Sequence, residues 1–538
     1  MRPYSLFKIR RPIYILIIVN ILFFTLLSLH IKPLDPSILI AGGGVIVLMV
    51  TSYIIIVKKQ MGDQYIFLIM SMLVSLGIIM LYRLNPDYGF AQIKWYGLGI
   101  VLYFMSYILF QVIKNWDRYI YAYIAGSMLL FLITFTLGVS IKGSINWVRI
   151  GDFSFQPAEA TKIFFVFFIA AYYKLRLSSD EALISPGHNA ILSDNSTVPE
   201  LQSQKQVHSN YDISDESKSG DKVGSGDEVE PGDGTKSGDK VKPGFEETEI
   251  SIENKVVSSE NSTNAMSSQL DDSNSISFQS DNHIKAGFSL RDFFKKCKTS
   301  DYRELIRNKQ IIKNKYVFLA IIYLHLFLLL AQRELGMTIL FYVVFISIFY
   351  IYEKDYRLLF YNIGALAVIL VLSYFTLAHV RVRLTTWIEP WDQISGKGYQ
   401  ITQSLFAIAA GGFFGTGLGL GNPDYIPVVH TDFIFSAICE EMGLFGGMAV
   451  VLLYFILIYR GFKIALTIKE TFKKIVALGI TLIYGYQTFI IIGGVIKLIP
   501  LTGITLPFIS YGGSSLISAF IAFGILQAIS GKGSWADT

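Results

Sequence analysis

The chain has 538 residues, of which 52% are hydrophobic and only 16% are charged, and its mean hydropathy is +0.48. Such values lie outside the range of soluble globular domains and indicate a polytopic membrane protein. The formal net charge of +5 is too small to argue for a nucleic-acid partner, and two cysteines, Cys297 and Cys439, in unrelated contexts exclude a disulfide framework and a cysteine metal site.

Apolar runs long enough to cross about 30 Å of hydrocarbon, roughly 20 residues each, recur along the chain. We therefore predict an all-α polytopic integral membrane protein with about 12 transmembrane helices. The predicted spans are 12–30, 37–57, 63–82, 95–113, 118–140, 160–176, 316–331, 335–352, 357–378, 432–459, 475–496 and 504–529.

Lysine and arginine residues recur on alternate loops, as the positive-inside rule expects for a chain with both termini in the cytoplasm. Residues 141–159, 332–334, 379–431 and 497–503 would then lie on the outer face. The basic residues that set this orientation are Arg2, Lys8, Arg10, Arg11, Lys58, Lys59, Lys114, Arg118, Lys354, Arg357, Arg460, Lys463, Lys469, Lys473 and Lys474.

Residues 178–290 are dominated by Ser, Gly, Asp, Glu and Lys, and the run "SKSGDKV" at 217–223 recurs as "TKSGDKV" at 235–241. Such a composition cannot bury enough apolar surface to offset the entropy of ordering, so we predict a long disordered cytoplasmic insert. The basic segment 291–315 that follows is either an amphipathic helix on anionic lipid or an ordinary positive flank of the next span.

Polar residues gather in four places on the predicted outer side, at the edges of apolar spans. A charge at the bilayer centre costs about 2.5–3.5 kcal/mol, so charges kept at such edges are informative. The four places are 143–162 with Arg149, Gln156, Glu159 and Lys162; 331–336 with Arg333 and Glu334; 430–447 with His430, Asp432, Glu440 and Glu441; and 497–516 with Lys497 and Ser510.

Each place also has a structural interpretation. Arg149 could be a snorkelling anchor, Asp432 could cap its helix, and Glu440 and Glu441 could pair with a neighbouring lysine. All four places nevertheless share a face with the loop 379–431. Carboxylates and basic groups converging beside lipid suit a substrate with an anionic, lipid-linked phosphate. The candidate phosphate-binding residues are Arg149, Lys162, Arg333, Arg383 and Lys497.

The loop 379–431 itself is longer than ordinary connections, and loops of this length are usually functional. Its glycines between 411 and 421 allow the backbone to approach a ligand closely. Asp392 follows Pro390 and Trp391, and a carboxylate held there could accept a proton from an attacking hydroxyl. The alternative for Asp392 taken alone is a solvated turn residue.

The chain resembles the SEDS family (shape, elongation, division and sporulation), typified by the RodA, FtsW and SpoVE proteins. The resemblance implies a core of ten transmembrane helices, to which residues 1–62 add about two more. The core would then comprise 63–177 and 316–530, followed by a short tail, 531–538. The matching runs are "NWVRIGDFSFQPAEATK", "AQRELGMTIL", "GKGYQITQSLFAIAAGGFFGTGLG", "IPVVHTDFIFSAICEEMGLFGG" and "PLTGITLPFISYGGSS".

The resemblance implies a peptidoglycan glycosyltransferase of the bacterial cytoplasmic membrane that polymerises lipid II on the outer face, for elongation, division or sporulation. Its implied partners are a class B penicillin-binding protein and other membrane proteins of the divisome or elongasome. Carried over onto this chain, the supporting polar site comprises Trp147, Gln156, Glu159, Glu334, Tyr399, Gln400, Gln403, His430, Asp432, Glu440, Glu441 and Ser510.

The family's essential aspartate commonly stands where this chain has Gln393, one position after Asp392. We expect Asp392 to take that role through a local shift of register in an irregular loop. It would remove the proton from the acceptor's 4-hydroxyl, and that oxygen would attack C1 of the donor with inversion. The leaving pyrophosphate would be stabilised by basic side chains, with or without a divalent cation such as Mg²⁺ or Mn²⁺. Asn146 and Arg333 also depart from the family pattern.

Two other functions compete with polymerisation. A transporter or flippase for lipid-linked precursors would also need many spans, buried charges and a broken helix. A SEDS-like scaffold without catalysis is compatible with Gln393 at the aspartate position. The position of the polar groups discriminates between them, because a flippase needs a path across the bilayer and a polymerase needs one site on the outer face.

Overall fold

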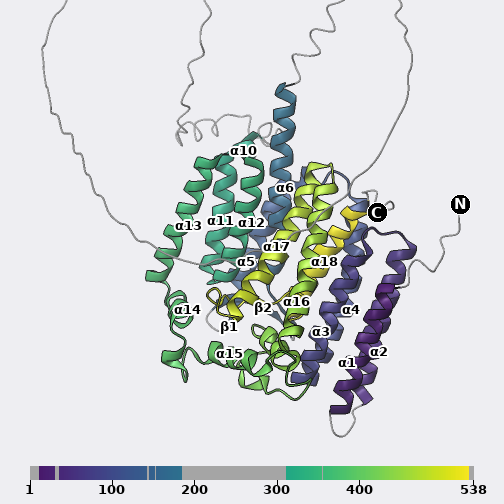
Figure 1. The fold of residues 1–538 in the computed structure, drawn as a ribbon. Coiled ribbons are helices and arrows are strands. Elements are labelled where there is room, and N and C mark those ends of the chain that lie inside the picture. The colour runs from purple at the N-terminus through teal and green to yellow at the C-terminus, as the bar shows by residue number, and fades with distance from the viewer. Residues whose placement is uncertain are drawn as a thin grey trace, which may run out of the picture. The chain divides into compact units, whose positions relative to one another are not determined.

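The structure is a computed structural model, and it describes residues 11–30, 36–141, 144–151, 153–184, 310–353 and 355–531. Within these ranges the chain is almost entirely helical (Figure 1). The predicted disordered insert, apart from its first residues, and most of the basic segment 291–315 lie outside the described residues.

The prediction of an all-α polytopic membrane protein is confirmed. Ten helical segments in the described ranges are long and apolar enough to cross a membrane. They are α1 (Arg11–His30), α2 (Pro36–Lys58), α3 (Gln64–Leu84), α4 (Pro86–Val112), α5 (Ile120–Leu137, preceded by a 3-10 turn, Trp116–Tyr119), α12 (Leu335–Glu353), α13 (Tyr356–Thr376), α16 (Ile434–Thr467), α17 (Thr471–Val495) and α18 (Gly513–Ser530).

Two further helices fill the remaining predicted spans. The first, α6 (Pro157–Ile184), carries several charges, and the second, α11 (Lys315–Ala331), is shorter than the others and follows a single turn, α10 (Gln310–Lys313). Each of the twelve predicted apolar runs thus corresponds to a helix. Two starts differ strongly: α4 already begins at Pro86, ahead of the predicted run 95–113, and the run 504–529 becomes helical only at Gly513.

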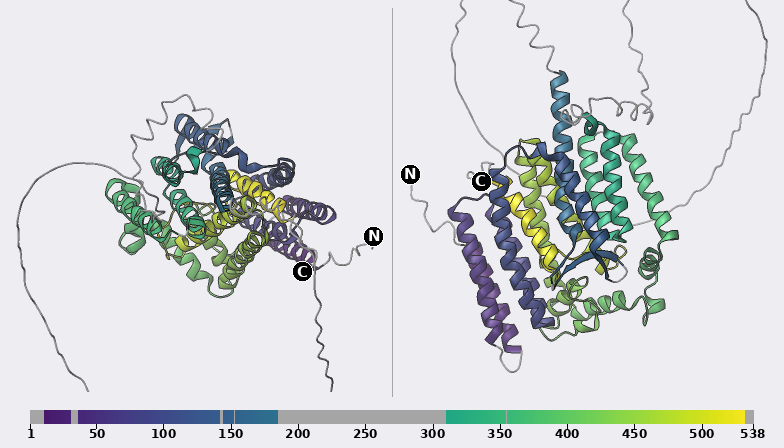
Figure 2. Two further views of the ribbon diagram at one scale, coloured as in Figure 1. Left: turned by 90° about the horizontal axis from the view of Figure 1, so that it is seen from above. Right: turned by 180° about the vertical axis from the view of Figure 1, so that it is seen from behind.

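The helices form a bundle with two distinct ends (Figures 1 and 2). The N-terminal end of α1 and the C-terminal end of α18 lie at the same end of the bundle, which we call the terminal end. The other, the loop end, carries the long segment between α13 and α16. Helices α1 and α2 pack beside α3 along one edge of the bundle, whereas α11, α12 and α13 occupy the opposite edge.

The interior is closely packed around α6. Tyr172 of α6 stacks on Phe318 of α11 with ring centroids 3.8 Å apart. Helix α17 approaches α6 at Gly479, where an added Cβ would lie 2.6 Å from Val166. Small residues at such crossings let membrane helices pack tightly, since apolar burial gives little driving force inside a bilayer.

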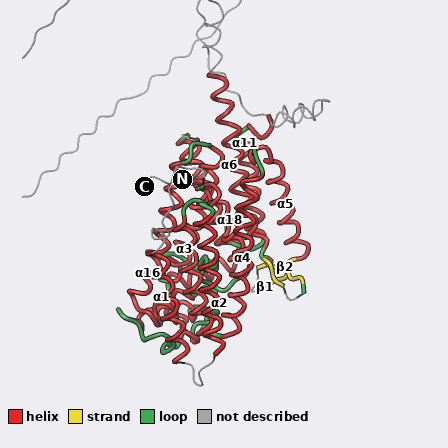
Figure 3. Tube along the Cα trace, turned by 90° about the vertical axis from the view of Figure 1, so that its right-hand side faces the viewer, coloured by secondary structure: helices red, strands yellow, loops and turns green. Residues whose placement is uncertain are grey.

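The predicted outer loop 141–159 contains a small antiparallel sheet, which the sequence did not lead us to expect. Strands β1 (Gly138–Ile141), β2 (Ser144–Ile150) and β3 (Phe153–Phe155) pair in sequence order. Val148 lies opposite both Gly138 and Phe155 in the two ladders. The sheet lies at the loop end beside the finish of α5 (Figure 3) and leads directly into α6.

The long loop 379–431 is also structured. It contains α14 (Ala378–Ile388), a 3-10 turn (Trp391–Gln393), α15 (Tyr399–Gly411) and a second 3-10 turn (Pro423–Tyr425). Helix α15 runs across the loop end and not along the spanning helices (Figure 1).

Candidate active site

A non-helical stretch, residues 500–512, connects α17 to α18 at the loop end; we call it the extended segment. Pro500 and Pro507 have no amide hydrogen to donate, and Gly503 has a positive φ of 72°. Phe508 also has a positive φ, 70°, which is uncommon for a residue with a side chain. Non-helical backbone at membrane depth is tolerated only where it is buried in protein or lines a cavity.

Side chains from several helices hold the extended segment in place by bonding to its carbonyl oxygens. These bonds satisfy acceptors that helix formation would otherwise satisfy. The donors are Arg383 Nη1 to Thr502 (2.5 Å), Gln487 Nε2 to Thr505 (2.8 Å), Gln92 Nε2 to Ser510 (3.2 Å) and the Tyr454 hydroxyl to Pro507. The predicted site residue Ser510 also donates from Oγ to the Thr431 carbonyl at 2.5 Å.

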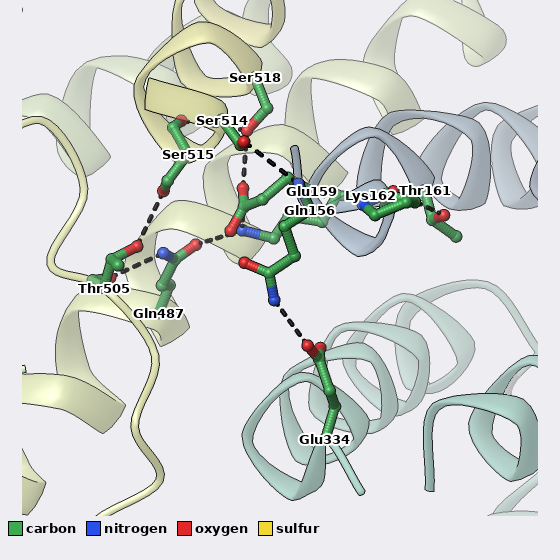
Figure 4. Close-up of polar contacts among 11 residues, drawn as sticks. Gln156, Glu159, Thr161, Lys162, Glu334, Gln487, Thr505, Ser514, Ser515 and Ser518 are labelled. Atoms are coloured by element: carbon green, nitrogen blue, oxygen red, sulfur yellow. Dashed lines mark hydrogen bonds and ion pairs between the residues drawn. The ribbon is translucent and has the colours of Figure 1, made fainter. Parts of the chain in front are cut away.

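The first polar cluster lies where α6 begins (Figure 4). Pro157 opens the helix, so Glu159 falls in its first turn and Lys162 follows one turn later. The Lys162 ammonium lies 2.8 Å from Glu159 Oε2 and donates to Gln487 Oε1 at 2.8 Å. Ser518 of α18 donates to the same carboxylate oxygen at 2.7 Å. Because Gln487 also donates to the extended segment, this cluster is joined directly to it.

The second polar cluster surrounds Glu334, in the turn between α11 and α12. Its Oε1 accepts hydrogen bonds from Gln156 Nε2 at 2.6 Å and from Asn146 Nδ2 of β2. Burial raises the pKa of Glu334 to about 7, the two amide donors oppose that rise, and Glu159 adds to it. The backbone N–H of Gln156 donates to Ser514 Oγ at the start of α18, 3.2 Å away.

The third polar cluster pairs Arg383 of α14 with Asp432, which precedes α16. The Asp432 carboxylate favours the charged form of Arg383, whereas burial lowers the pKa of the guanidinium. Both side chains face Gly503 of the extended segment. A Cβ built on that glycine would lie 3.3 Å from the guanidinium and 3.6 Å from Asp432 Oδ2. The first and third clusters therefore contact the extended segment, and the second is bonded to the start of α18 that follows it.

Lys497 joins α14 to the start of the extended segment. Its carbonyl oxygen accepts a hydrogen bond from Trp387 Nε1 at 3.1 Å, and its ammonium lies 3.4 Å from the Ile388 carbonyl oxygen. The 3-10 turn that contains Asp392 follows three residues after Ile388. These contacts fix the start of the polar loop relative to the extended segment.

The structure corrects the expectation that Asp392 lies in a pocket among basic side chains. Its side chain is exposed, and it forms no hydrogen bond or ion pair with any described residue. The turn is anchored instead by Trp391, whose ring lies 5.8 Å from that of Phe406. The proposed base is therefore reached from solvent in this conformation, and substrate would have to bring the acceptor to it.

The five predicted phosphate-binding residues are also not gathered into one pocket. Three of them lie at the extended segment. Arg383 donates to it directly, Lys162 is bonded to Gln487, which donates to it, and Lys497 comes shortly before it in the chain. Arg149, however, is exposed on β2, and Arg333 is exposed in the turn before Glu334 with a positive φ of 61°. Trp147, next to Arg149, is partly buried in the same strand.

Other predicted site residues lie near the loop end without entering the three clusters. Tyr399, Gln400 and Gln403 are partly buried in the first turns of α15. The His430 ring forms an aromatic group with two tyrosines, with centroids 4.6 Å from Tyr88 and 5.9 Å from Tyr511.

Glu440 and Glu441 accept hydrogen bonds from the glycine-rich loop, which follows α15 and comprises about residues 411–422. Glu441 Oε1 lies 2.5 Å from Nε of Arg83, and Glu440 Oε1 accepts a hydrogen bond from the backbone N–H of Asn422 at 2.7 Å. Arg83 Nη2 also donates to the Gly421 carbonyl at 2.6 Å. Sequence reasoning expected a lysine partner for these acids and missed Arg83, because it closes an apolar run more than three hundred residues upstream.

No three His, Cys, Asp or Glu side chains in the described ranges are grouped as metal ligands. The described residues therefore form no ready metal site, and an optional Mg²⁺ or Mn²⁺ stays a prediction that the proposed reaction does not use.

The bundle and its clusters define a multi-pass membrane protein with a polar site built at one end. A family profile described as cell cycle protein (FtsW, RodA, SpoVE) matches residues 63–190 and 289–534. The chain belongs to this family. The match begins at α3, so α1 and α2 lie outside it.

Curated relatives bear names from the same family. "Peptidoglycan glycosyltransferase RodA" of Mycobacterium tuberculosis (strain ATCC 25618 / H37Rv) is 43% identical over 199 residues, which are 37% of this chain and 42% of that protein. "Stage V sporulation protein E" of Bacillus subtilis (strain 168) is 46% identical over 150 residues, 28% of this chain and 41% of that protein. The matched part thus spans less than half the length of either relative.

A solved structure described as "Structural coordination of polymerization and crosslinking by a peptidoglycan synthase complex" has the same fold. The TM-score is 0.53 at 18% sequence identity, and the match covers 87% of this chain and 97% of that chain.

Proposed function

We propose that the chain is a peptidoglycan glycosyltransferase that polymerises lipid II on the outer face of the bacterial cytoplasmic membrane. Its family membership and its similarity to relatives with that activity in their names support this function. The basic loops predicted from the sequence support an orientation in which the terminal end faces the cytoplasm.

The observation that carries the proposal is the extended segment, with charged clusters on both sides. Lys162 and Glu159 reach it through Gln487, and Arg383 and Asp432 flank Gly503. Guanidinium and ammonium groups at the edge of a membrane suit a pyrophosphate leaving group, because they stabilise the charge that develops as the bond to the sugar breaks.

In the proposed reaction, the carboxylate of Asp392 accepts the proton of the acceptor sugar's 4-hydroxyl. The hydroxyl oxygen then forms a bond to C1 of the donor sugar as the bond from C1 to the lipid pyrophosphate breaks, with inversion. We assign the leaving pyrophosphate to Arg383 and Lys497, and their position where α14 meets the extended segment supports this assignment. An exposed carboxylate leaves room for the acceptor sugar to approach it.

A class B penicillin-binding protein that cross-links the new strands is the partner this function implies. The structurally similar chain comes from a synthase complex that coordinates polymerization with crosslinking, which supports such a pairing here.

The direct test incubates purified full-length chain with fluorescent lipid II, with and without a transpeptidase partner, and sizes the products. Long glycan chains support the proposal. Movement of labelled lipid II between leaflets of a vesicle, without polymer, would replace it with the flippase function.

A further inference from the structure

Helix α15 has an outer apolar side that no described part of the chain covers. Its inner side packs on α16, where Ser404 Oγ lies 2.6 Å from Ser436 Oγ, and Ile401 and Ala407 are buried. On the other side Phe406, Ala409 and Ala410 are exposed, at the spacing that places residues on one face of a helix.

Aromatic residues extend this side beyond both ends of the helix. Phe413 and Phe414 follow α15, and Phe414 is 84% exposed. Before the helix, Trp391 is 49% exposed and rests on Phe406. We call these residues, Trp391, Phe406, Ala409, Ala410, Phe413 and Phe414, the α15 apolar face. Contiguous apolar patches of this kind mark a binding surface.

The α15 apolar face is continuous with the exposed side of a spanning helix. The rings of Phe413 and Phe414 lie 6.5 Å and 5.5 Å from that of Phe445 in α16. From Phe445 onward, α16 exposes apolar side chains at spacings of three and four residues: Met448, Leu452, Phe455 and Tyr459. In a segment apolar enough to cross a membrane, such a stripe faces acyl chains.

Helix geometry sets the depth of this contact. Arg460, directly after the stripe, forms an ion pair with Asp63, whose backbone N–H donates to Ser530 Oγ at the terminal end of α18. Phe445 lies about 22 Å from Arg460 along the helix axis at about 1.5 Å per residue, whereas the hydrocarbon core is about 30 Å thick. With Arg460 at one boundary, Phe445 therefore lies in the opposite leaflet, about 8 Å inside the other boundary.

We propose that the α15 apolar face inserts into the leaflet at the loop end, at the boundary between headgroups and acyl chains. Bilayer lipid is its occupant. An apolar outer side flanked by the exposed charges of Glu389, Asp392 and Lys397 suits this boundary. Because Trp391 belongs to the face, Asp392 is held at the depth of lipid headgroups. The inference depends only on the chain spanning a membrane, not on its proposed chemistry.

The test places a bimane fluorophore on Ala409→Cys, or on Lys397→Cys as the matched control, in full-length chain with Cys297→Ser; the buried Cys439 is kept. Each labelled protein is incorporated as a single copy into phosphatidylglycerol–phosphatidylethanolamine nanodiscs. One quencher is a lipid with a doxyl nitroxide near the top of its acyl chain, and the other is aqueous iodide.

We expect doxyl lipid to quench the label at position 409 and iodide to leave it bright, with the reverse at position 397. Adding Phe413→Ser and Phe414→Ser should shift the label at 409 toward iodide quenching while the thermal transition shows a folded protein. Iodide quenching at 409 without doxyl quenching would overturn the proposal. Protection from both quenchers would also overturn it, because protein and not lipid would then cover the face.

Discussion

The ammonium of Lys162 lies 2.8 Å from the carboxylate of Glu159, and both side chains are only 2% exposed. Both charged groups have a further hydrogen bond, because Lys162 donates to Gln487 and Glu159 accepts from Ser518. The pair also links α6 to the extended segment through Gln487 and the Thr505 carbonyl. A buried ion pair at this position therefore holds the site together as well as contributing charge to it.

Removing one partner of this pair should strongly destabilise the protein. Lys162→Met leaves Glu159 buried without its cation, which costs about 3–5 kcal/mol, whereas Lys162→Met with Glu159→Leu should recover part of that loss. Thermal unfolding in nanodiscs measures the loss of stability in the single and in the double variant. The control is Lys473→Met, which breaks the more exposed pair with Glu470 and should shift the transition little. A single variant as stable as the wild type would contradict the assignment of the ion pair.

Glu334 should make stability depend on pH. Its ordinary pKa of 4.5 is raised to about 7 by burial, so the folded protein keeps a proton that the unfolded chain releases over this window. Stability should thus fall as pH rises from about 4.5 to about 7 and change little above that. Glu334→Gln mimics the protonated form and should flatten this part of the profile of transition temperature against pH. An unchanged slope in the variant would assign the dependence to other groups.

Gly503 should be intolerant of a side chain. Its positive φ disfavours other residues by about 1–2 kcal/mol, and an added Cβ would crowd Arg383 and Asp432. We expect Gly503→Ala to lower polymerisation of lipid II far more than it lowers the transition temperature. Gly364→Ala is the matched control, because a Cβ there meets nothing within 4 Å. Equal activity of the two variants would show that the extended segment need not keep this shape.

Arg83 should hold the glycine-rich loop against α16. Arg83→Gln leaves the buried Glu441 without its cation and removes the bond to the Gly421 carbonyl. We expect faster chymotryptic cleavage after Tyr425, an exposed aromatic residue next to the loop, measured under native conditions. Arg381→Gln, in exposed α14 sequence, is the control and should leave the cleavage rate unchanged. Cleavage at the wild-type rate in Arg83→Gln would exclude this role.

The sequence predicts the spanning helices well, because a helix in lipid must be apolar over its whole length. It places the start of the last span too early, at 504, although Pro507 lies inside that run and has no backbone N–H to donate; the structure becomes helical only at Gly513. Helices α14 and α15 are not predicted, because they are short, lie at the loop end and need no long apolar run.

The hydrogen-bond partners of the charged site residues are harder to predict than the charged residues themselves. Glu159, Lys162 and Glu334 stand out as charges at the edges of spans. Gln487 does not, because it is an uncharged residue within an apolar run, and its bond to Lys162 joins positions 325 residues apart. The position of Asp392 also depends on tertiary packing, and only the structure shows that it faces solvent.

The most direct measurement of the central claim is the length of glycan that purified Asp392→Ala makes from lipid II, beside Glu389→Gln as the neighbouring exposed acid. We predict that Asp392→Ala makes no polymer while its thermal transition stays at the wild-type temperature, and that Glu389→Gln polymerises like the wild type. Full-length glycan from Asp392→Ala would remove this residue from the mechanism, and no polymer from the wild type with or without a transpeptidase would contradict the glycosyltransferase function itself.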